Sequence, residues 1–589
     1  MFTTRPELAG TFGMIASTHY LATAAGMAVL EDGGNAFDAA VAAGFVLQIV
    51  EPHLNGPGGE VPAIFATAIG KTPTVLCGQG TAPAAATIAH YRGLGLDLVP
   101  GSGLLAATVP GAFGGWLTLL RDHGTRTLRD VLTYAIGYAE HGHPIAARAA
   151  ATIGTVADLF RTEWPTSAEV WLPHDAPPRG LFANPALART YSRVLAEAEA
   201  AGSDRDRQIE AARAAWYEGF VAEAVDTFAR TELLDSSGQR HAGVITGADL
   251  AGWRASYEPP VFLDTAGWRL CKIGLWSQGP TLLQQLRLHD ALGELPAAGS
   301  AEAVHQVVEV AKLAFADREA WYGEQAAASF EDLLDPGYAA ERAKLVGETA
   351  AYELRPGMPN GRTPRLARWL TGAATGTHTL AGTGEPTVGR DGVTRGDTCH
   401  VDAVDRWGNI ISVTPSGGWL QSSPAIPGLG FCLGSRAQMF WLDEGLPASL
   451  TPGARPRITL SPSLALRDGE PVLAFGTPGG DQQDQWQLGF WLNHTRYGMN
   501  LQAAIDAPAW HTNGFPSSFH PRETVPGEIV AEDRLGEPVL TELERRGHRV
   551  VRSDGWSLGR LSAVSRDPAT GVLRAAANPR GMLGYAAGR

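Results

Sequence analysis

The first part of the chain alternates between apolar helical runs and glycine-rich turns. Residues 19–35 have helical periodicity that ends at Gly33 and Gly34, and the alanine-rich run 36–50 stops before Pro52. Glycine adopts the left-handed conformation of a helix end, and proline lacks the amide proton that continues a helix. Residues 54–69 predict a glycine-rich turn leading into a strand. Further helical patterns cover residues 128–161, 187–229 and 300–321.

After Gly396 the pattern changes to short strands. Residues 399–415 predict an edge hairpin with its turn at 406–409, and residues 461–480 predict a second hairpin with its turn at 467–470. Residues 498–510 predict a helix that ends near Pro508. Helices and strands are mixed and no fixed-period repeat occurs, so we expect a layered α/β or α+β architecture.

Residues 355–395 are rich in Gly, Thr, Pro and Arg and have little periodicity, which is typical of an exposed or mobile segment. Thr398 follows this segment at the mouth of a strand. A threonine there can simply favour the strand. It can also be a nucleophile if the Asp397–Thr398 bond is cut, because the freed α-amine would then act as general base.

Composition narrows the function classes. The 589 residues are 44% hydrophobic, enough for one large core or two, and the formal net charge is −14 without Lys/Arg blocks. Such a chain is a poor candidate for binding nucleic acid or an anionic membrane. Four cysteines lie far apart without a CxxC, and the N-terminal residues contain no apolar run typical of a signal peptide. We therefore expect a soluble, cytoplasmic protein.

Other familiar sites are poorly supported. No P-loop or GxSxG elbow occurs, and the two histidines of "EHGHP" lie in a loop-like stretch without a third ligand, so we expect no metal and no cofactor. "GTPGGDQQ" follows the apolar run 472–475. Consecutive glycines after a strand offer backbone amides to an oxyanion, although an ordinary strand-ending turn explains this stretch equally well.

Ten short motifs then occur in order along nearly the whole chain: "GGNAFDAAVAA", "VEPHLNGPGG", "TAPAAAT", "VPGAFGGW", "WYEG", "AKLAFADR", "GDTCHVDAVDRWGN", "SPS", "GTPGG" and "AIDAPAW". In this the sequence resembles the γ-glutamyltranspeptidase family of N-terminal nucleophile hydrolases. The resemblance implies a four-layer αββα fold and a precursor that cleaves itself before a threonine. The expected large subunit is 1–397 and the small subunit is 398–589. A homodimer of these heterodimers is compatible with the resemblance.

The resemblance also implies roles for individual residues. Thr398 matches the nucleophile, and its freed amine matches the base. Gly479 and Gly480 match the pair whose amides bind the oxyanion. Ser416 falls where the family keeps a threonine that hydrogen-bonds the nucleophile. Cys399 replaces a second threonine and should lie on the opposite side of the strand from Thr398, where a packing role is expected.

The substrate-binding positions depart from the family pattern. Gln79 stands where an arginine holds the substrate's α-carboxylate, and Phe440 stands where an acidic residue holds the α-amine. Gly418 replaces an asparagine, and Ile458 and Thr459 replace a pair of serines. An amino acid zwitterion needs a charged partner at each end, or its desolvation is uncompensated. The acyl specificity should therefore differ from γ-glutamyl.

Three functions follow. The first is a self-processing amide hydrolase or acyltransferase that acts on a small uncharged or apolar acyl amide. Its acyl pocket would be lined by Phe440, Trp441 and Trp419. A simple carboxylate substrate is also compatible with it, because Arg436 or Arg457 could supply a cation. The second is a conventional γ-glutamyltransferase or glutathione hydrolase with unusual ligands. The third is an uncleaved, non-catalytic binding protein, which the intact Thr398 argues against.

Overall fold

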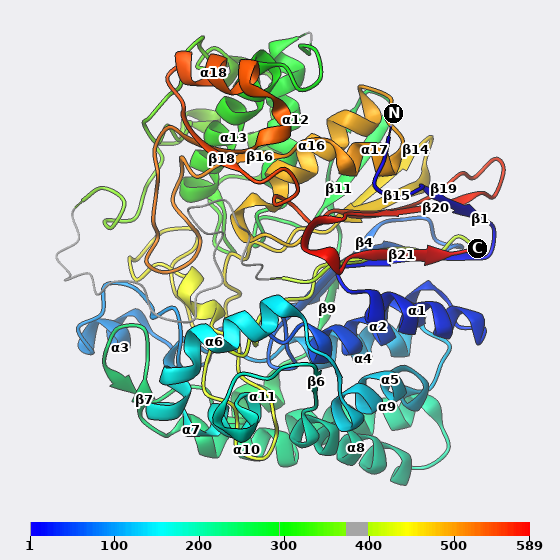
Figure 1. Cartoon of the computed structure of the whole chain (residues 1–589). Helices are drawn as coiled ribbons and strands as arrows, with labels where there is room; N and C mark the ends of the chain where they lie inside the picture. The colour runs from blue at the N-terminus through cyan, green and yellow to red at the C-terminus, as the bar shows by residue number, and fades with distance from the viewer. Residues whose placement is uncertain (1, 294, 373–397) are drawn as a thin grey trace.

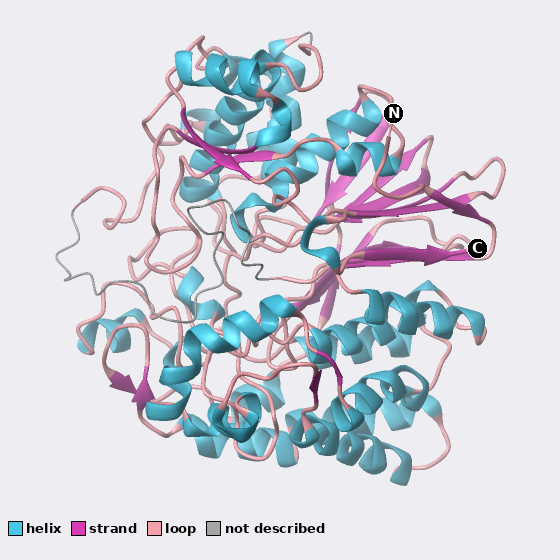
Figure 2. Cartoon of the chain, in the orientation of Figure 1, coloured by secondary structure: helices cyan, strands magenta, loops and turns pink. Residues whose placement is uncertain are grey.

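The computed structural model describes residues 2–293, 295–372 and 398–589. Two seven-stranded sheets face each other, and a layer of helices covers the outer face of each (Figure 1; Figure 2). The four layers confirm the αββα fold that the family resemblance implied. No helix among the described residues is both long enough and apolar enough to cross a bilayer.

The first sheet contains the strand that follows Thr398. Its strand order is β21 (Tyr585–Gly588), β2 (Gly13–Ser17), β12 (Val401–Asp405), β13 (Ile410–Val413), β3 (Val61–Ala66), β4 (Thr74–Gly78) and β9 (Ser256–Glu258). In β12, Val401 pairs with Ser17 on one side and with Val413 on the other. The predicted hairpin is therefore present, but its position at an edge was wrong. Both of its strands are central and fully buried.

The second sheet has the order β1 (Leu8–Gly10), β20 (Leu573–Ala577), β19 (Ser562–Arg566), β15 (Glu470–Gly476), β14 (Ser463–Arg467), β11 (Trp268–Lys272) and β10 (Val261–Thr265). The predicted hairpin over 461–480 forms its centre as β14 and β15. Both sheets combine strands from before and after Thr398. Strand β12 lies beside β2, and β14 lies beside β11.

One helical layer packs on the first sheet. It contains α1 (Tyr20–Glu31), α2 (Ala36–Val50), α4 (Ala112–His123), α5 (Leu128–His141), α8 (Pro185–Ala200) and α9 (Arg205–Tyr217). Helix α2 is buried along its whole length, which its alanines permit because small side chains allow close packing. The Asn35 side chain caps it by accepting hydrogen bonds from the amides of Phe37 and Asp38. In turn, the Asp38 carboxylate accepts a hydrogen bond from the Asn35 amide.

The opposite layer covers the second sheet. It contains α12 (Pro280–Leu292), α13 (Ala301–Trp321), α16 (Gln483–Thr495), α17 (Leu501–Asp506) and α18 (Glu537–Arg545), together with a small sheet of β16 (Trp510–Thr512), β17 (Glu528–Glu532) and β18 (Arg549–Ser553). The remaining helices lie around these layers: α3 (Ile88–Gly93), α6 (Ala147–Thr162), α7 (Pro165–Trp171), α10 (Phe220–Ala229), α11 (Gly247–Gly252), α14 (Phe330–Leu334) and α15 (Pro336–Ala343). Two short strand pairs complete the strands among the described residues: β5 (His143–Pro144) with β6 (Leu181–Phe182), and β7 (Leu233–Leu234) with β8 (Arg240–His241).

The helical predictions are confirmed, with breaks that the periodicity did not show. Residues 128–161 form α5 and α6, and 187–229 form α8, α9 and α10. The segment 355–395 is described only to residue 372. That part is loop with short turns at Pro359–Gly361 and at residues 368–372, and half of its residues are exposed. Residues 373–395 lie outside the described residues.

A buried polar group joins the two sheets. The carboxylate of Asp402 on β12 accepts from the hydroxyls of Ser412 (2.7 Å) and Ser562 (2.7 Å), and it lies 2.9 Å from His400 Nε2. All four side chains are buried. Removing the carboxylate would leave buried donors without their acceptor, which costs more than losing a solvated pair.

We therefore expect Asp402→Ala to lower the stability by on the order of 3 kcal/mol. The measurement is the thermal denaturation midpoint followed by circular dichroism. Asp158→Ala is the matched control, because the Asp158 side chain is 97% exposed and its pair with Arg161 should contribute about half a kcal/mol or less. Equal midpoints for the two variants would show that the Asp402 group does not stabilise the sheet packing.

Candidate active site

Thr398 lies directly before β12 and is fully buried. An antiparallel bridge pairs it with Ser416, which follows β13 on the neighbouring part of the hairpin. This pairing brings the two hydroxyls together, with Thr398 Oγ1 3.3 Å from Ser416 Oγ. The hairpin thus places at one end of the central sheet two of the residues singled out in the sequence.

A buried ion pair lies behind Ser416. Arg436 Nη2 donates to Ser416 Oγ at 2.6 Å, and Arg436 Nε donates to the carboxylate of Glu60. The guanidinium also lies over the Trp419 ring, 4.8 Å from its centroid. Because Arg436 occupies an acceptor position on Ser416 Oγ, the Ser416 hydroxyl proton can be directed to Thr398 Oγ1. Arg436 can therefore influence Thr398 through a single hydroxyl.

The loop "LNGPGG" contains glycines because it packs closely against the chain that follows β13. It pairs with the chain after β13, since Asn55 bridges Gly417 and the backbones of Glu60 and Ser416 exchange hydrogen bonds of 2.8 and 3.0 Å. A Cβ on Gly59 would overlap the Ser416 carbonyl oxygen. Only glycine permits this approach of two backbones.

A second charged pair holds the backbone of Thr398. Arg560 Nη2 donates to the Thr398 carbonyl at 3.2 Å, and Arg560 Nη1 lies 3.5 Å from Glu51 Oε1. Burial would raise the pKa of Glu51, but Arg560 and two nearby histidines outweigh it and hold the pKa below its ordinary value. The ionised Glu51 therefore fixes the guanidinium that binds Thr398.

Cys399 lies on the opposite side of the chain from the Thr398–Ser416 pair. Its Sγ is 3.2 Å from Glu51 Oε2 and 3.6 Å from Asn55 Nδ2, and it belongs to the core between the first sheet and its helices. Burial, with Glu51 as the second cause, raises the pKa of the Cys399 thiol well above its ordinary value. A neutral, enclosed thiol supports the predicted packing role.

The "GTPGG" loop follows β15 and turns sharply. Gly479 and Gly480 have φ of 130° and 54°, values that disfavour other residues. Their carbonyls are held by Gln482 N and by Gln278 Nε2, each at 3.0 Å. The loop is also linked to Thr398, since the Arg560 amide donates to Thr477 Oγ1 at 3.0 Å. Arg560 thus contacts both parts of the predicted machinery.

The predicted substrate-binding residues come from separate segments of the chain. Gln79 lines a cavity of about 680 Å³ beside Trp253 and Arg455, and the described residues lining it do not include Thr398 or Ser416. The Thr459 hydroxyl is buried and has no hydrogen-bond partner among the described residues. Gly418 lies in the loop beside Gly59, with φ of 62°. Gly418 stands two residues after Ser416 and belongs to the same loop.

The three aromatic residues expected in one acyl pocket lie in three different hydrophobic clusters. Phe440 packs with Tyr91 and Leu105, whereas Trp441 packs with Leu98. Trp419 packs against a third cluster and is the one that touches Arg436. Phe519 joins it there, with its ring centroid 5.8 Å from the same guanidinium.

Of the two cations considered from the sequence, Arg436 contacts Ser416 directly. Arg457 instead pairs with Glu319 at 2.8 Å and donates to the Arg318 carbonyl. Burial, despite Glu319, lowers the pKa of Arg457.

Sequence reasoning missed Glu51, Glu60 and Arg560. Glu51 and Glu60 stand inside the motif "VEPHLNGPGGE", so an acidic residue at each end of a glycine-rich turn was the available indication. Arg560, in "SLGRLSAV", has no pattern that separates it from the other arginines.

Known proteins resemble this chain over its full length. The gamma-glutamyltranspeptidase family model matches residues 22–588. The glutathione hydrolase-like YwrD proenzyme of Bacillus subtilis (strain 168) is 29% identical and covers 97% of this chain and 98% of its own. The acylase ACY 1 proenzyme of Pseudomonas sp. (strain SE83) is 30% identical, covering 96% and 92%. The solved structure of LmbA2991T421A is 59% identical over 100% of both chains, with a TM-score of 0.94. The chain belongs to the gamma-glutamyltranspeptidase family and is an enzyme of that family's hydrolase and acylase type.

Proposed function

We propose that the chain cleaves itself between Asp397 and Thr398 and then acts as an amide hydrolase or acyltransferase with Thr398 as its N-terminal nucleophile. The observation that supports this most directly is the 3.3 Å contact between Thr398 Oγ1 and Ser416 Oγ, with Arg436 donating to the same Ser416 oxygen. The proposed products are a large subunit 1–397 and a small subunit 398–589. The proenzyme names of the relatives agree with such processing.

In the proposed reaction the freed α-amine of Thr398 removes the proton from Oγ1, which attacks the substrate carbonyl carbon. The amides of Gly479 and Gly480 hold the resulting oxyanion. The carbon–nitrogen bond then breaks, and the leaving amine takes the proton from the Thr398 α-ammonium. Water or an acceptor amine resolves the ester at Oγ1. Arg560 keeps the Thr398 carbonyl in place throughout.

The charges around Thr398 favour an uncharged acyl group. Arg436 is already paired with Glu60, and both side chains are almost completely buried. The pair contributes no net charge, so neither end of an α-amino acid would gain an uncompensated partner there. Trp419 and Phe519 add apolar surface beside the guanidinium. We assign a small apolar or neutral acyl amide as the substrate class.

Conventional γ-glutamyl chemistry is the second candidate, because one relative is a glutathione hydrolase-like protein and Arg436 provides a cation beside Ser416. An uncleaved, non-catalytic scaffold is the third candidate. An intact-mass spectrum separates it from the other two, since it would show one full-length chain.

We expect wild-type kcat/KM for a phenylacetyl or acetyl anilide to exceed that for a γ-glutamyl anilide by about 10-fold or more, since one missing charge-assisted hydrogen bond costs about 1.5–3 kcal/mol. Release of the aniline measures both rates. Thr398→Ala should remove both activities and so controls for contaminating enzymes. A strong preference for the γ-glutamyl substrate would reject the assigned acyl class and leave the conventional family activity.

A further inference from the structure

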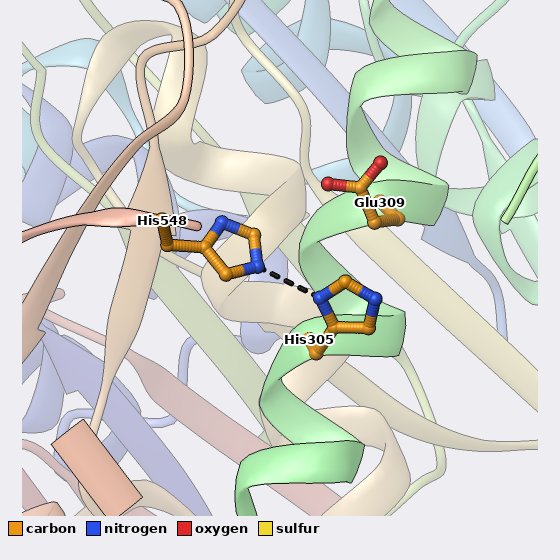
Figure 3. A group of neighbouring side chains, drawn as sticks. All are labelled: His305, Glu309 and His548. Atoms are coloured by element: carbon orange, nitrogen blue, oxygen red, sulfur yellow. Dashed lines mark hydrogen bonds between the residues drawn. The ribbon is translucent and has the colours of Figure 1, made fainter. Parts of the chain in front are cut away.

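Two histidines and a glutamate meet in the helical layer that covers the second sheet. His305 and Glu309 lie one turn apart on α13, and His548 comes from the residue before β18 (Figure 3). One ligand atom from each lies within 4.8 Å of the others, and all three side chains are buried. The "EHGHP" histidines considered from the sequence are not part of this cluster.

The hydrogen bonds around His305 determine which of its nitrogens can act as a ligand. His305 Nε2 lies 2.8 Å from the Gly347 carbonyl, which only accepts, so Nε2 bears the proton. His305 Nδ1 then presents a lone pair, and it lies 2.7 Å from His548 Nε2. A ring N–H donated to a backbone carbonyl is the usual support of a metal-binding histidine, because it fixes the tautomer and orients the ring.

His548 can offer its lone pair to the same point. Its Nδ1 is buried and has no hydrogen-bond partner among the residues the structure describes. When the proton resides on Nδ1, Nε2 is free to coordinate, so a shift of one proton converts the His305–His548 hydrogen bond into two imidazole ligands.

The Glu309 carboxylate can supply a third ligand beside the two imidazoles. Its carboxylate accepts from Lys312 Nζ (2.6 Å), from Arg355 Nη2 (3.3 Å) and from the Ala351 amide. These three donors leave about one of the four lone-pair positions of a carboxylate. The two cations balance more than the one negative charge, so an anionic fourth ligand such as hydroxide would offset part of the charge of a dication.

We propose that His305, Glu309 and His548 bind one Zn²⁺-class ion. Two imidazoles and one carboxylate are ligands that Zn²⁺ prefers, with bonds of about 2.0–2.2 Å. Tetrahedral geometry separates two ligand nitrogens by roughly 3.3 Å, so the rings must move apart by about 0.6 Å from their hydrogen-bonded spacing. The fourth position is left to water or an anion.

The proposed site combines residues from both sides of Thr398 in the sequence. His305 and Glu309 precede Thr398 in the sequence, and His548 follows it. If the Asp397–Thr398 bond is cut as proposed above, the ion would join the two subunits. The site itself does not depend on cleavage, so its test is independent of the proposed reaction.

Metal binding is tested on the full, chelator-treated protein with Zn²⁺ and Co²⁺ added alone. We expect one ion per chain by calorimetry, a higher thermal midpoint, and Co²⁺ visible absorption typical of nitrogen and oxygen ligands. His548→Gln should weaken binding on the order of 100-fold, because one of the protein ligands is lost. Its side-chain amide can still donate to His305 Nδ1, so this variant should keep the fold. Glu309→Gln should weaken binding as well.

His141→Gln is the matched control, because the His141 side chain is 78% exposed and outside the cluster. It should bind the ion like wild type. Wild-type protein without stoichiometric binding would overturn the proposal and leave a plain histidine–histidine hydrogen bond. Unchanged affinity in folded His548→Gln would equally overturn it, since the ion would then lie elsewhere.

Discussion

Thr398→Ala is expected to leave one full-length chain and to abolish turnover, with kcat falling by at least about 10⁴-fold. Alanine keeps the backbone bridge to Ser416 and the Arg560 contact, but it has no oxygen to attack either the preceding peptide bond or a substrate. Intact-mass spectrometry and a denaturing gel report the cleavage, and anilide hydrolysis reports turnover.

Thr398→Ser is the matched control. Its hydroxyl can occupy the same position 3.3 Å from Ser416 Oγ, so cleavage should continue, although more slowly because serine lacks the methyl group that restricts χ1. If the alanine variant were cleaved at Asp397/Thr398, or if an uncleaved chain had full activity, the proposed nucleophile and its amine base would both be wrong.

Gly480→Val is expected to lower kcat by about 10²–10³-fold, the usual loss for one oxyanion donor. Gly480 has φ of 54°, which a β-branched residue adopts only with strain, so the turn that presents the two amides should change. The hydrogen bond from Gln278 to the Gly480 carbonyl would shift with it. The measurement is kcat on the cleaved variant with its preferred anilide.

Gly137→Val provides the comparison. Gly137 lies within α5, and a Cβ added there meets no other atom within 4 Å, so the same side-chain change should leave kcat unaltered. Cleaved Gly480→Val with wild-type turnover would remove "GTPGG" from the mechanism. Circular dichroism of both variants separates a loss of fold from a loss of the oxyanion donors.

Local pattern was enough to predict most elements of the fold. The glycine and proline limits of α1 and α2 and the turns of both hairpins depend on neighbouring residues, and each is confirmed. The edge position of the 399–415 hairpin failed because β12 pairs with β2, and Val404 meets Met14 from almost the other end of the sequence. A sheet neighbour that distant leaves no mark in the alternation of a single strand.

The contacts of the candidate site also divide into those that follow from local pairing and those that depend on the folded structure. Thr398 and Ser416 belong to one hairpin, so their contact follows from local pairing. Arg560 and Glu60 come from opposite ends of the chain, and only the folded structure shows that Arg560 meets Thr398 and that Glu60 meets Ser416 and Arg436. The single acyl pocket expected from Phe440, Trp441 and Trp419 depended on side-chain directions, which a sequence alone does not determine.

The pairing of strands from before Thr398 with strands from after it has a consequence for protein production. If residues 1–397 and 398–589 were made from two separate genes, the first product would expose open edges of β2 and β11 and the second those of β12 and β14, because these strands pair across that boundary in the structure. Open edges of this kind recruit other chains into aggregates. The two products should therefore be insoluble when expressed apart, and we expect the sheets to form while both segments belong to one polypeptide, before any cleavage at Asp397/Thr398.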